Sequence, residues 1–115
     1  AARGKALFPG LINCHAHLPA NINRGITEDF GFPPDLHLPV QARSLLSPEE
    51  VTVMALLGAV ECIKSGNTTA LGFGQGIAGY AEELAKTGLR WVWAECGGDG
   101  ITPPEWRPGS GREPP

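Results

Sequence analysis

Short apolar segments alternate with segments of helical pattern over most of this chain, and the alternation leaves few folds open to it. The patterns predict strands at residues 11–14, 68–73 and 89–94. Between them they predict helices at residues 48–64 and 77–87. Consecutive parallel strands need a crossover connection, and this order supplies one helix for each crossover. We therefore expect an α/β fold in which three parallel strands are joined by two crossover helices.

The first predicted helix has the clearest boundaries. Ser47 can cap its first turn, Pro48 suits the first helical position, and Glu50 completes a capping box. Gly66 suits the left-handed conformation that often ends a helix. Nearly every position from 51 to 63 is apolar, so we expect this helix to be covered on more than one face.

Polar and aromatic side chains near these elements are predicted to have structural roles. Glu61, in the largely apolar helix, is expected to face solvent or to pair with Lys64. Trp91 and Trp93 share one face of the third strand and are expected to pack against a helix.

The remaining residues form a loop and a tail. Residues 18–46 are interrupted by prolines and glycines without a sustained period, which predicts a long loop with at most a turn or two of helix. Residues 100–115 are rich in proline and poor in aliphatic side chains, which is typical of an irregular segment. The chain thus divides into a folded part, 1–99, and a Pro/Gly-rich tail, 100–115.

The charge balance and the apolar pattern argue against two classes of partner. Nine basic and 12 acidic residues give a net charge of -3, so no positive field attracts phosphate backbones or anionic lipid. The longest uninterrupted apolar run, Val53 to Val60, is far below the roughly 18 residues that a membrane-spanning helix needs. We therefore expect neither nucleic acid nor a membrane as a partner.

The cysteines favour a reducing compartment. Cys14, Cys62 and Cys96 form an odd and widely spaced set, which is typical of free thiols rather than of a disulfide framework. The sequence therefore favours a cytoplasmic location. Cys14 alternates with the histidines that follow it and is predicted to lie in the core.

His15 and His17 carry the sharpest chemical signal. They are two residues apart at the end of the first predicted strand, so both imidazoles leave the same face and can reach one ion. Neutral imidazole is a common ligand of zinc and other first-row divalent metals. The plainer alternative is a pair of partly exposed histidines bonded to backbone carbonyls. Parallel strands place their sites beyond their carboxyl ends, and a long loop follows here, which favours a metal.

The histidine pair belongs to a longer series of motifs. In the order and spacing of these motifs, the chain from about residue 4 to 96 resembles the amidohydrolase superfamily, particularly its cytosine deaminase and triazine chlorohydrolase type. The segments that carry the resemblance are residues 9–17 (PGLINCHAH), Arg24-Gly25, residues 46–51 and 55–58, Glu61, and residues 65–69 and 87–90.

The resemblance implies a metal-dependent hydrolase built on a (β/α)8 barrel. It implies that His15 and His17 are the first two metal ligands and that the ion is zinc or iron(II). A metal-bound hydroxide would attack a carbon bearing an amino, amide or chloride leaving group on a small molecule. Substrate and leaving group stay open.

Length indicates that the chain is an N-terminal fragment of such a barrel. A complete (β/α)8 barrel takes at least about 200 residues, and three strands cannot close one. The other ligands expected from the family, a third His and an Asp, would lie on absent strands, as would the proton-transferring group. The catalytic residues are therefore unknown, and we expect the 115-residue chain alone to be inactive.

A dinucleotide-binding module is the main alternative. Gly74, Gly76 and Gly79 form a Gly-x-Gly-x-x-Gly pattern after the second strand, and Glu95 ends the third strand about twenty residues later. In that layout the backbone amides at the helix start hold pyrophosphate and the carboxylate binds ribose.

The third alternative is an inactive truncated product. Three parallel strands leave two open sheet edges, and the apolar helix lacks an outer partner, so self-association is expected.

Overall fold

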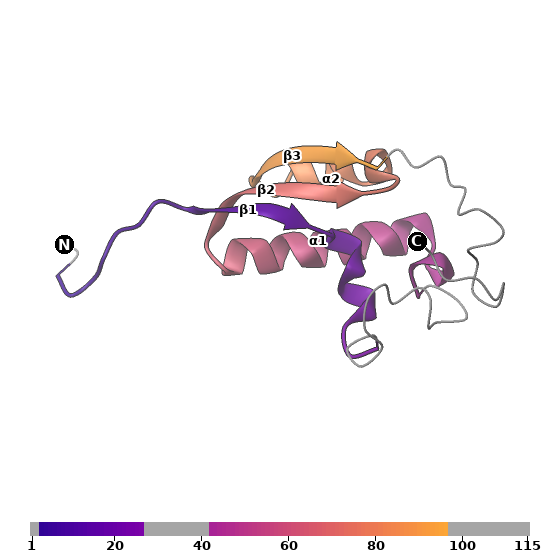
Figure 1. Cartoon of the computed structure of the whole chain (residues 1–115), viewed down its shortest axis with the longest axis horizontal. Coiled ribbons are helices and arrows are strands. Elements are labelled where there is room, and N and C mark those ends of the chain that lie inside the picture. Colours follow the sequence, from indigo (N-terminus) through magenta and orange to yellow (C-terminus); the bar gives the residue numbers. More distant parts are fainter. Residues whose placement is uncertain (1–2, 27–41, 97–115) are drawn as a thin grey trace, which may run out of the picture.

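The chain folds as three parallel strands in an open sheet, in a computed structural model that describes residues 3–26 and 42–96. The strands are β1 (Leu11–Ala16), β2 (Asn67–Gly74) and β3 (Arg90–Glu95), hydrogen-bonded in the order β1-β2-β3 (Figure 1). The prediction of an α/β fold with parallel strands is confirmed.

The helix α1 (Pro48–Lys64) has the predicted bounds and the predicted caps. The backbone N–H of Glu50 donates to Ser47 Oγ at 3.3 Å, and the N–H of Ser47 donates to Glu50 Oε2 at 2.8 Å. Beyond its last turn, Gly66 adopts a φ of 84°, the left-handed conformation that glycine tolerates best. In the part of the chain that the structure describes, no helix is long and apolar enough to cross a membrane.

The second crossover helix is broken, so the prediction of one continuous helix at 77–87 is wrong. A 3-10 turn, η4 (Ile77–Gly79), precedes a short helix, α2 (Ala81–Ala85). Between them Tyr80 has a φ of -132° and a ψ of -1°, which is outside helical geometry. Its side chain is buried in the core at 4% exposure. Packing of this ring therefore overrides the helical pattern of the segment.

Strand and loop bounds differ from the predictions by small amounts. β1 continues past residue 14 to Ala16, because its backbone pairs with β2 as far as Gly72. The predicted loop contains two 3-10 helices, η1 (Leu18–Asn23) and η3 (Ala42–Leu45). Part of that loop, residues 27–41, and the predicted tail at 100–115 lie outside the described residues.

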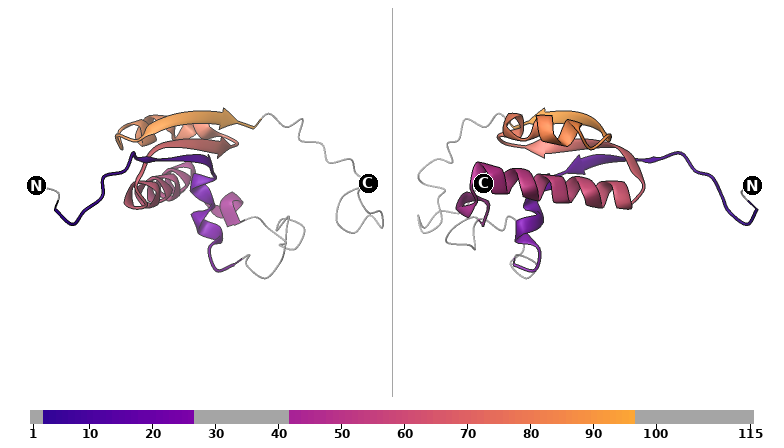
Figure 2. Two further views of the ribbon diagram at one scale, coloured as in Figure 1. Left: turned by 60° about the vertical axis from the view of Figure 1, so that its left-hand side comes forward. Right: turned by 180° about the vertical axis from the view of Figure 1, so that it is seen from behind.

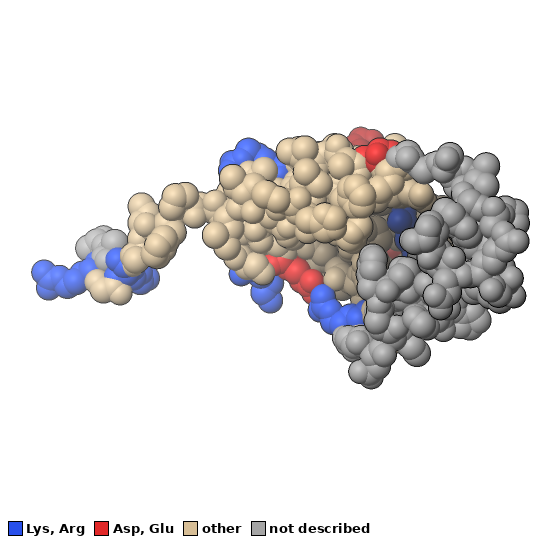
Figure 3. Space-filling view, viewed as in Figure 1, with Lys and Arg blue, Asp and Glu red and all other residues tan. Residues whose placement is uncertain are grey.

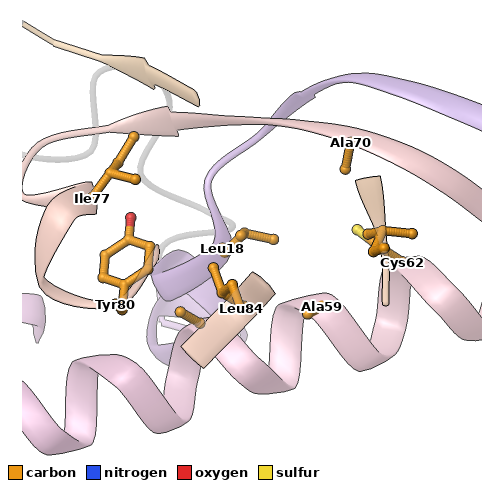
Figure 4. Close-up of a cluster of buried hydrophobic side chains, with 9 residues drawn as sticks. Leu18, Ala59, Cys62, Ala70, Ile77, Tyr80 and Leu84 are labelled. Atoms are coloured by element: carbon orange, nitrogen blue, oxygen red, sulfur yellow. The ribbon is translucent and has the colours of Figure 1, made fainter. Parts of the chain in front are cut away.

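One face of the sheet is covered by both α1 and α2, as the view from behind shows (Figure 2). Buried side chains from both helices meet Ala70 of β2 in a single core cluster (Figure 4). We call this the covered face; its core consists of Leu18, Ala55, Ala59, Cys62, Ala70, Ile77, Tyr80, Leu84 and Leu89. The core residues that α1 contributes are small, namely Ala55, Ala59 and Cys62.

The opposite face of the sheet, which we call the bare face, has no covering element among the described residues. Side chains alternate between the faces of a strand, so Leu71 and its neighbour Val92 point away from Ala70 and the helices. Ile12 is 67% exposed and Val92 is 52% exposed. Over the strands the surface in Figure 3 is largely uncharged, with the charged side chains at its margins.

A stripe along α1 is also uncovered within the described residues. Val53, Leu57 and Val60 are 58%, 43% and 48% exposed, at the spacing of one helix face. The expectation that α1 is covered on more than one face is therefore not met by this part of the chain.

Candidate metal centre

His15 and His17 lie at the carboxyl end of β1. His15 is the next-to-last residue of the strand, and His17 precedes the first turn of η1. The carboxyl ends of β2 and β3 lie at the same edge of the sheet, because all three strands are parallel. In parallel α/β folds this edge is where ligands bind.

A bulge in β1 sets the approach of the two histidines. Asn13 pairs with Ala70 and Ala16 pairs with Gly72, so three steps along β1 match two steps along β2. The Asn13 side chain stabilises the extra residue, since its Oδ1 accepts a hydrogen bond from the N–H of His15 at 3.0 Å. Bulges of this kind turn a side chain away from the regular strand direction.

The two imidazoles converge on one point. Their Nε2 atoms are 3.0 Å apart, with ring centroids 4.7 Å apart and ring planes inclined by 77°. Two imidazole nitrogens bound to one tetrahedral ion, each at about 2.0–2.1 Å from it, would be roughly 3.3 Å apart. The pair therefore fits a single divalent ion with little movement. The same distance suits a hydrogen bond between two neutral imidazoles, in which one Nε2–H donates to the other Nε2.

Phe73, near the end of β2, contacts both imidazoles. Its ring centroid is 5.3 Å from that of His15, with a tilt of 30°, and 5.2 Å from that of His17, nearly edge-on at 76°. We call these residues the three-ring cluster: His15, His17 and Phe73. The sequence alone did not identify Phe73 or Asn13 as residues of the site. Phe73 is the last residue of the second predicted strand, and Asn13 lies two positions before His15.

The ligand set is incomplete in the described part of the chain. Within residues 3–26 and 42–96, no group of three or more His, Cys, Asp or Glu side chains is placed to hold a metal ion. Cys14, between Asn13 and His15, adds no ligand to the pair. The prediction that Cys14 lies in the core is wrong: it is exposed, because β1 is an edge strand with no described element over that side chain.

The glycine-rich turn after β2 is held by Glu95. The Glu95 carboxylate accepts hydrogen bonds from the N–H of Gly76 at 2.5 Å and from the N–H of Ile77 at 2.9 Å. These are the amides that a pyrophosphate would need in the dinucleotide-binding alternative, with Gly74, Gly76 and Gly79 in the turn. The carboxylate occupies them and the following 3-10 turn is only three residues long, which argues against that alternative.

A polar cavity of about 240 Å³ lies between β1, η1 and α1, with His17 on its wall. Glu61 on the same wall forms two hydrogen bonds with Arg24, at 2.9 Å from Nη1 and 2.8 Å from Nη2. Glu61 is exposed, as one predicted alternative had it, but its ion-pair partner is Arg24, which η1 brings to α1, and not the predicted Lys64. Hydrogen bonding to Arg24 lowers the pKa of the Glu61 carboxyl below its usual value.

Trp91 packs against a helix as predicted. Its Nε1–H donates to the carbonyl of Leu84 in α2 at 3.0 Å, and its ring stacks on Trp93 with centroids 4.9 Å apart. Trp93 in turn lies across Gly72, where a side chain on the glycine would overlap the indole.

Fold and site together define an α/β segment with two convergent histidine side chains at the carboxyl edge of a parallel sheet. Residues 6–100 match the model of the amidohydrolase family. Because this match spans most of the chain, the chain belongs to the amidohydrolase family, and the resemblance inferred from the motifs is confirmed.

The similar curated proteins carry deaminase names. The chain is 39% identical over 90 residues to a 5-methylthioadenosine/S-adenosylhomocysteine deaminase of Thermococcus kodakarensis, covering 77% of this chain and 21% of that protein. It is 36% identical over 94 residues to a 5'-deoxyadenosine deaminase of Methanobrevibacter smithii, covering 79% of this chain and 21% of that protein. A protein of the latter name from Methanocaldococcus jannaschii is 35% identical over 95 residues, or 80% of this chain and 22% of that protein.

The chain thus spans about a fifth of the length of the curated relatives it matches. No solved structure matches it.

Proposed function

We propose that the chain is the N-terminal part of a (β/α)8 barrel in a metal-dependent deaminase that acts on an adenosine-type nucleoside. The observation that carries the proposal is the 3.0 Å approach of His15 Nε2 and His17 Nε2 at the carboxyl edge of a parallel sheet. The deaminase names of the relatives, each of which includes an adenosine derivative, support the substrate class.

His15 and His17 would hold a divalent ion, either zinc or iron(II), through their Nε2 atoms. When bound, such an ion supplies Lewis-acid activation of water for attack on an electrophilic carbon. Asn13 keeps the bulge that turns His15 toward His17. In deamination the carbon exchanges its amino group for oxygen, and ammonia leaves.

The rest of the site would be formed by other strands of the barrel. Catalytic zinc usually has three protein ligands, and this chain supplies two candidates. The remaining ligands and the proton-transferring group belong, on this proposal, to the four-fifths of the relatives' length that the chain does not span. The 115-residue chain alone is then inactive.

The other properties that we propose follow from the same assignment. Residues 1–99 form the barrel part and residues 100–115 an irregular tail. The protein is cytoplasmic, and its three cysteines are free thiols in the structure. The isolated chain associates with itself through the unpaired edges of β1 and β3.

Metal content of the purified chain tests the histidine pair. After equilibration with Zn²⁺, mass spectrometry is expected to find stoichiometric metal in the wild type and none in His15→Ala/His17→Ala. His37→Ala, the matched control for the remaining histidine of the chain, is expected to retain the metal. Size-exclusion chromatography of the same samples shows whether a second copy completes the site. Equal metal in the wild type and the double variant would overturn the assignment of His15 and His17.

A chimera tests the reaction. Residues 6–96 of this chain replace the matching segment of the Thermococcus kodakarensis relative. Ammonia release is measured with 5'-methylthioadenosine and with cytosine, and chloride release is measured with a chlorotriazine. We expect release from the adenosine derivative alone, reduced to background by His15→Ala. A folded, metal-loaded chimera that releases ammonia from cytosine but not from the nucleoside would contradict the substrate class.

A further inference from the structure

We propose that Phe73 is a positioning residue, which holds the imidazoles of His15 and His17 in the orientation that binds metal. This inference rests on the metal site proposed above and deepens it. Phe73 belongs to β2, while both histidines belong to β1 and the turn after it. A single side chain on a neighbouring strand therefore restrains two ligands that are close in sequence.

The two contacts of Phe73 differ in kind. Its ring lies tilted by 30° against His15 and nearly perpendicular, at 76°, to His17. With centroid separations of 5.3 Å and 5.2 Å, both contacts lie in the range of favourable aromatic pairs. Because the two imidazoles are themselves 77° apart, one flat ring can support one of them with its face and the other in an edge arrangement.

The histidines need this support because they are exposed. Both residues have exposed side chains, and an exposed imidazole exchanges between rotamers unless a neighbour restricts it. The Nε2 atoms meet at 3.0 Å only in one combination of ring orientations. Metal affinity is highest when ligands are already in the binding geometry, since less conformational freedom is then lost on binding.

The neighbours of Phe73 explain why it alone has this position on β2. Gly72, which precedes it, has no side chain and faces Trp93 on the covered face. Leu71, two residues back, shares the bare face with Phe73 but lies further from the carboxyl edge. Within the described residues, Phe73 is the aromatic side chain other than the two histidines that meets an imidazole.

Three variants of the 115-residue chain test the proposal, with Co²⁺ as the probe and its visible absorption as the readout of ligand geometry. Phe73→Leu keeps an apolar side chain but removes the flat ring, and it should weaken Co²⁺ binding about tenfold and change the absorption spectrum. Phe73→Tyr keeps the ring and should restore both the affinity and the spectrum. Leu71→Ala, on the same face of the same strand, should leave both unchanged.

A second measurement reads the ring orientation without metal. In the metal-free chain, NMR signals of the two imidazoles should shift in Phe73→Leu and stay near their wild-type positions in Phe73→Tyr and Leu71→Ala. Circular dichroism of each variant confirms that it is folded. Unchanged imidazole signals, or unchanged Co²⁺ affinity, in folded Phe73→Leu would overturn the role of Phe73. A wild-type chain whose Co²⁺ binding does not depend on His15 and His17 would instead overturn the metal site itself, and the imidazole signals would still decide whether Phe73 orients the rings.

Discussion

The described residues bury one face of the sheet and leave the other face largely exposed. On the covered face, Ala55, Ala59 and Leu84 of the helices are fully buried against the sheet. On the bare face, Ile12 and Val92 are more than half exposed, and the three-ring cluster lies at its carboxyl edge. The chain therefore completes one hydrophobic layer but only part of the candidate site, as expected if further strands close a barrel over the bare face.

Truncation of a core side chain should give the largest difference between the faces. Leu84→Ala removes the largest fully buried side chain and should lower the free energy of unfolding by about 2–5 kcal/mol. Val92→Ala, the control on the bare face, should change it by less than about 0.5 kcal/mol. Urea unfolding measures both. An equally large loss for Val92→Ala, dependent on protein concentration, would show that self-association covers the bare face.

A smaller loss of stability should result from overpacking the contact between α1 and η1. A Cβ at Gly58 of α1 would lie 2.9 Å from the carbonyl oxygen of Leu18 and 3.1 Å from its Cα. Gly58→Ala should therefore cost about 1–3 kcal/mol, despite the better helix propensity of alanine. Gly79→Ala, with open space around the added methyl, should be neutral or stabilise by up to about 1 kcal/mol. Thermal unfolding compares the two, and a stabilised Gly58→Ala would contradict the close contact between α1 and η1.

Substitutions at the two ends of α1 test how much the capping box stabilises this helix, which covers the sheet. Ser47→Ala removes the hydroxyl that accepts from the N–H of Glu50, and it should cost about 1 kcal/mol in urea unfolding. Ser65→Ala at the other end removes a hydroxyl that donates to the carbonyl of Glu61. That carbonyl also accepts from the N–H of Ser65, so this variant should cost less. The reverse order would mean that the capping box contributes little in solution.

The smallest effect should be the pH dependence of the Arg24–Glu61 pair. Arg24 lowers the pKa of Glu61 in the folded state, so the pair stabilises the fold above the usual carboxyl pKa and this contribution is lost as the pH falls through the lowered value. The stability difference between the wild type and Glu61→Gln should be small, because the pair is exposed, and largest near neutral pH. Urea unfolding as a function of pH checks it, with Glu82→Gln as a control on α2. A difference that grows on acidification would have the wrong sign.

Features that depend on neighbouring residues could be predicted from the sequence. The capping box and Gly66 define both ends of α1, and the apolar runs locate all three strands to within two residues at each end. The placement of His15 and His17 at a strand end also follows from local pattern. Each of these signals acts over a few residues, so chain order is enough to read them.

Contacts between residues that are distant in sequence were either not predicted or predicted wrongly. Tyr80 leaves the helix because its ring enters a core formed largely by other elements. Glu61 bonds Arg24 across 37 positions of sequence, whereas the sequence suggested a neighbour on the same helix. Phe73 contacts His15 and His17 from another strand, and no spacing in the sequence predicts that contact.

Local pattern thus determines that this chain forms parallel strands with crossover helices and carries two histidines at the edge where such sheets bind ligands. Only the tertiary structure decides that these histidines converge to 3.0 Å and that one aromatic ring supports both. The physical reason is the register of β1 against β2, where an added residue redirects His15 and brings the end of β1 beside Phe73. Register is a property of two strands together, and neither strand's sequence states it alone.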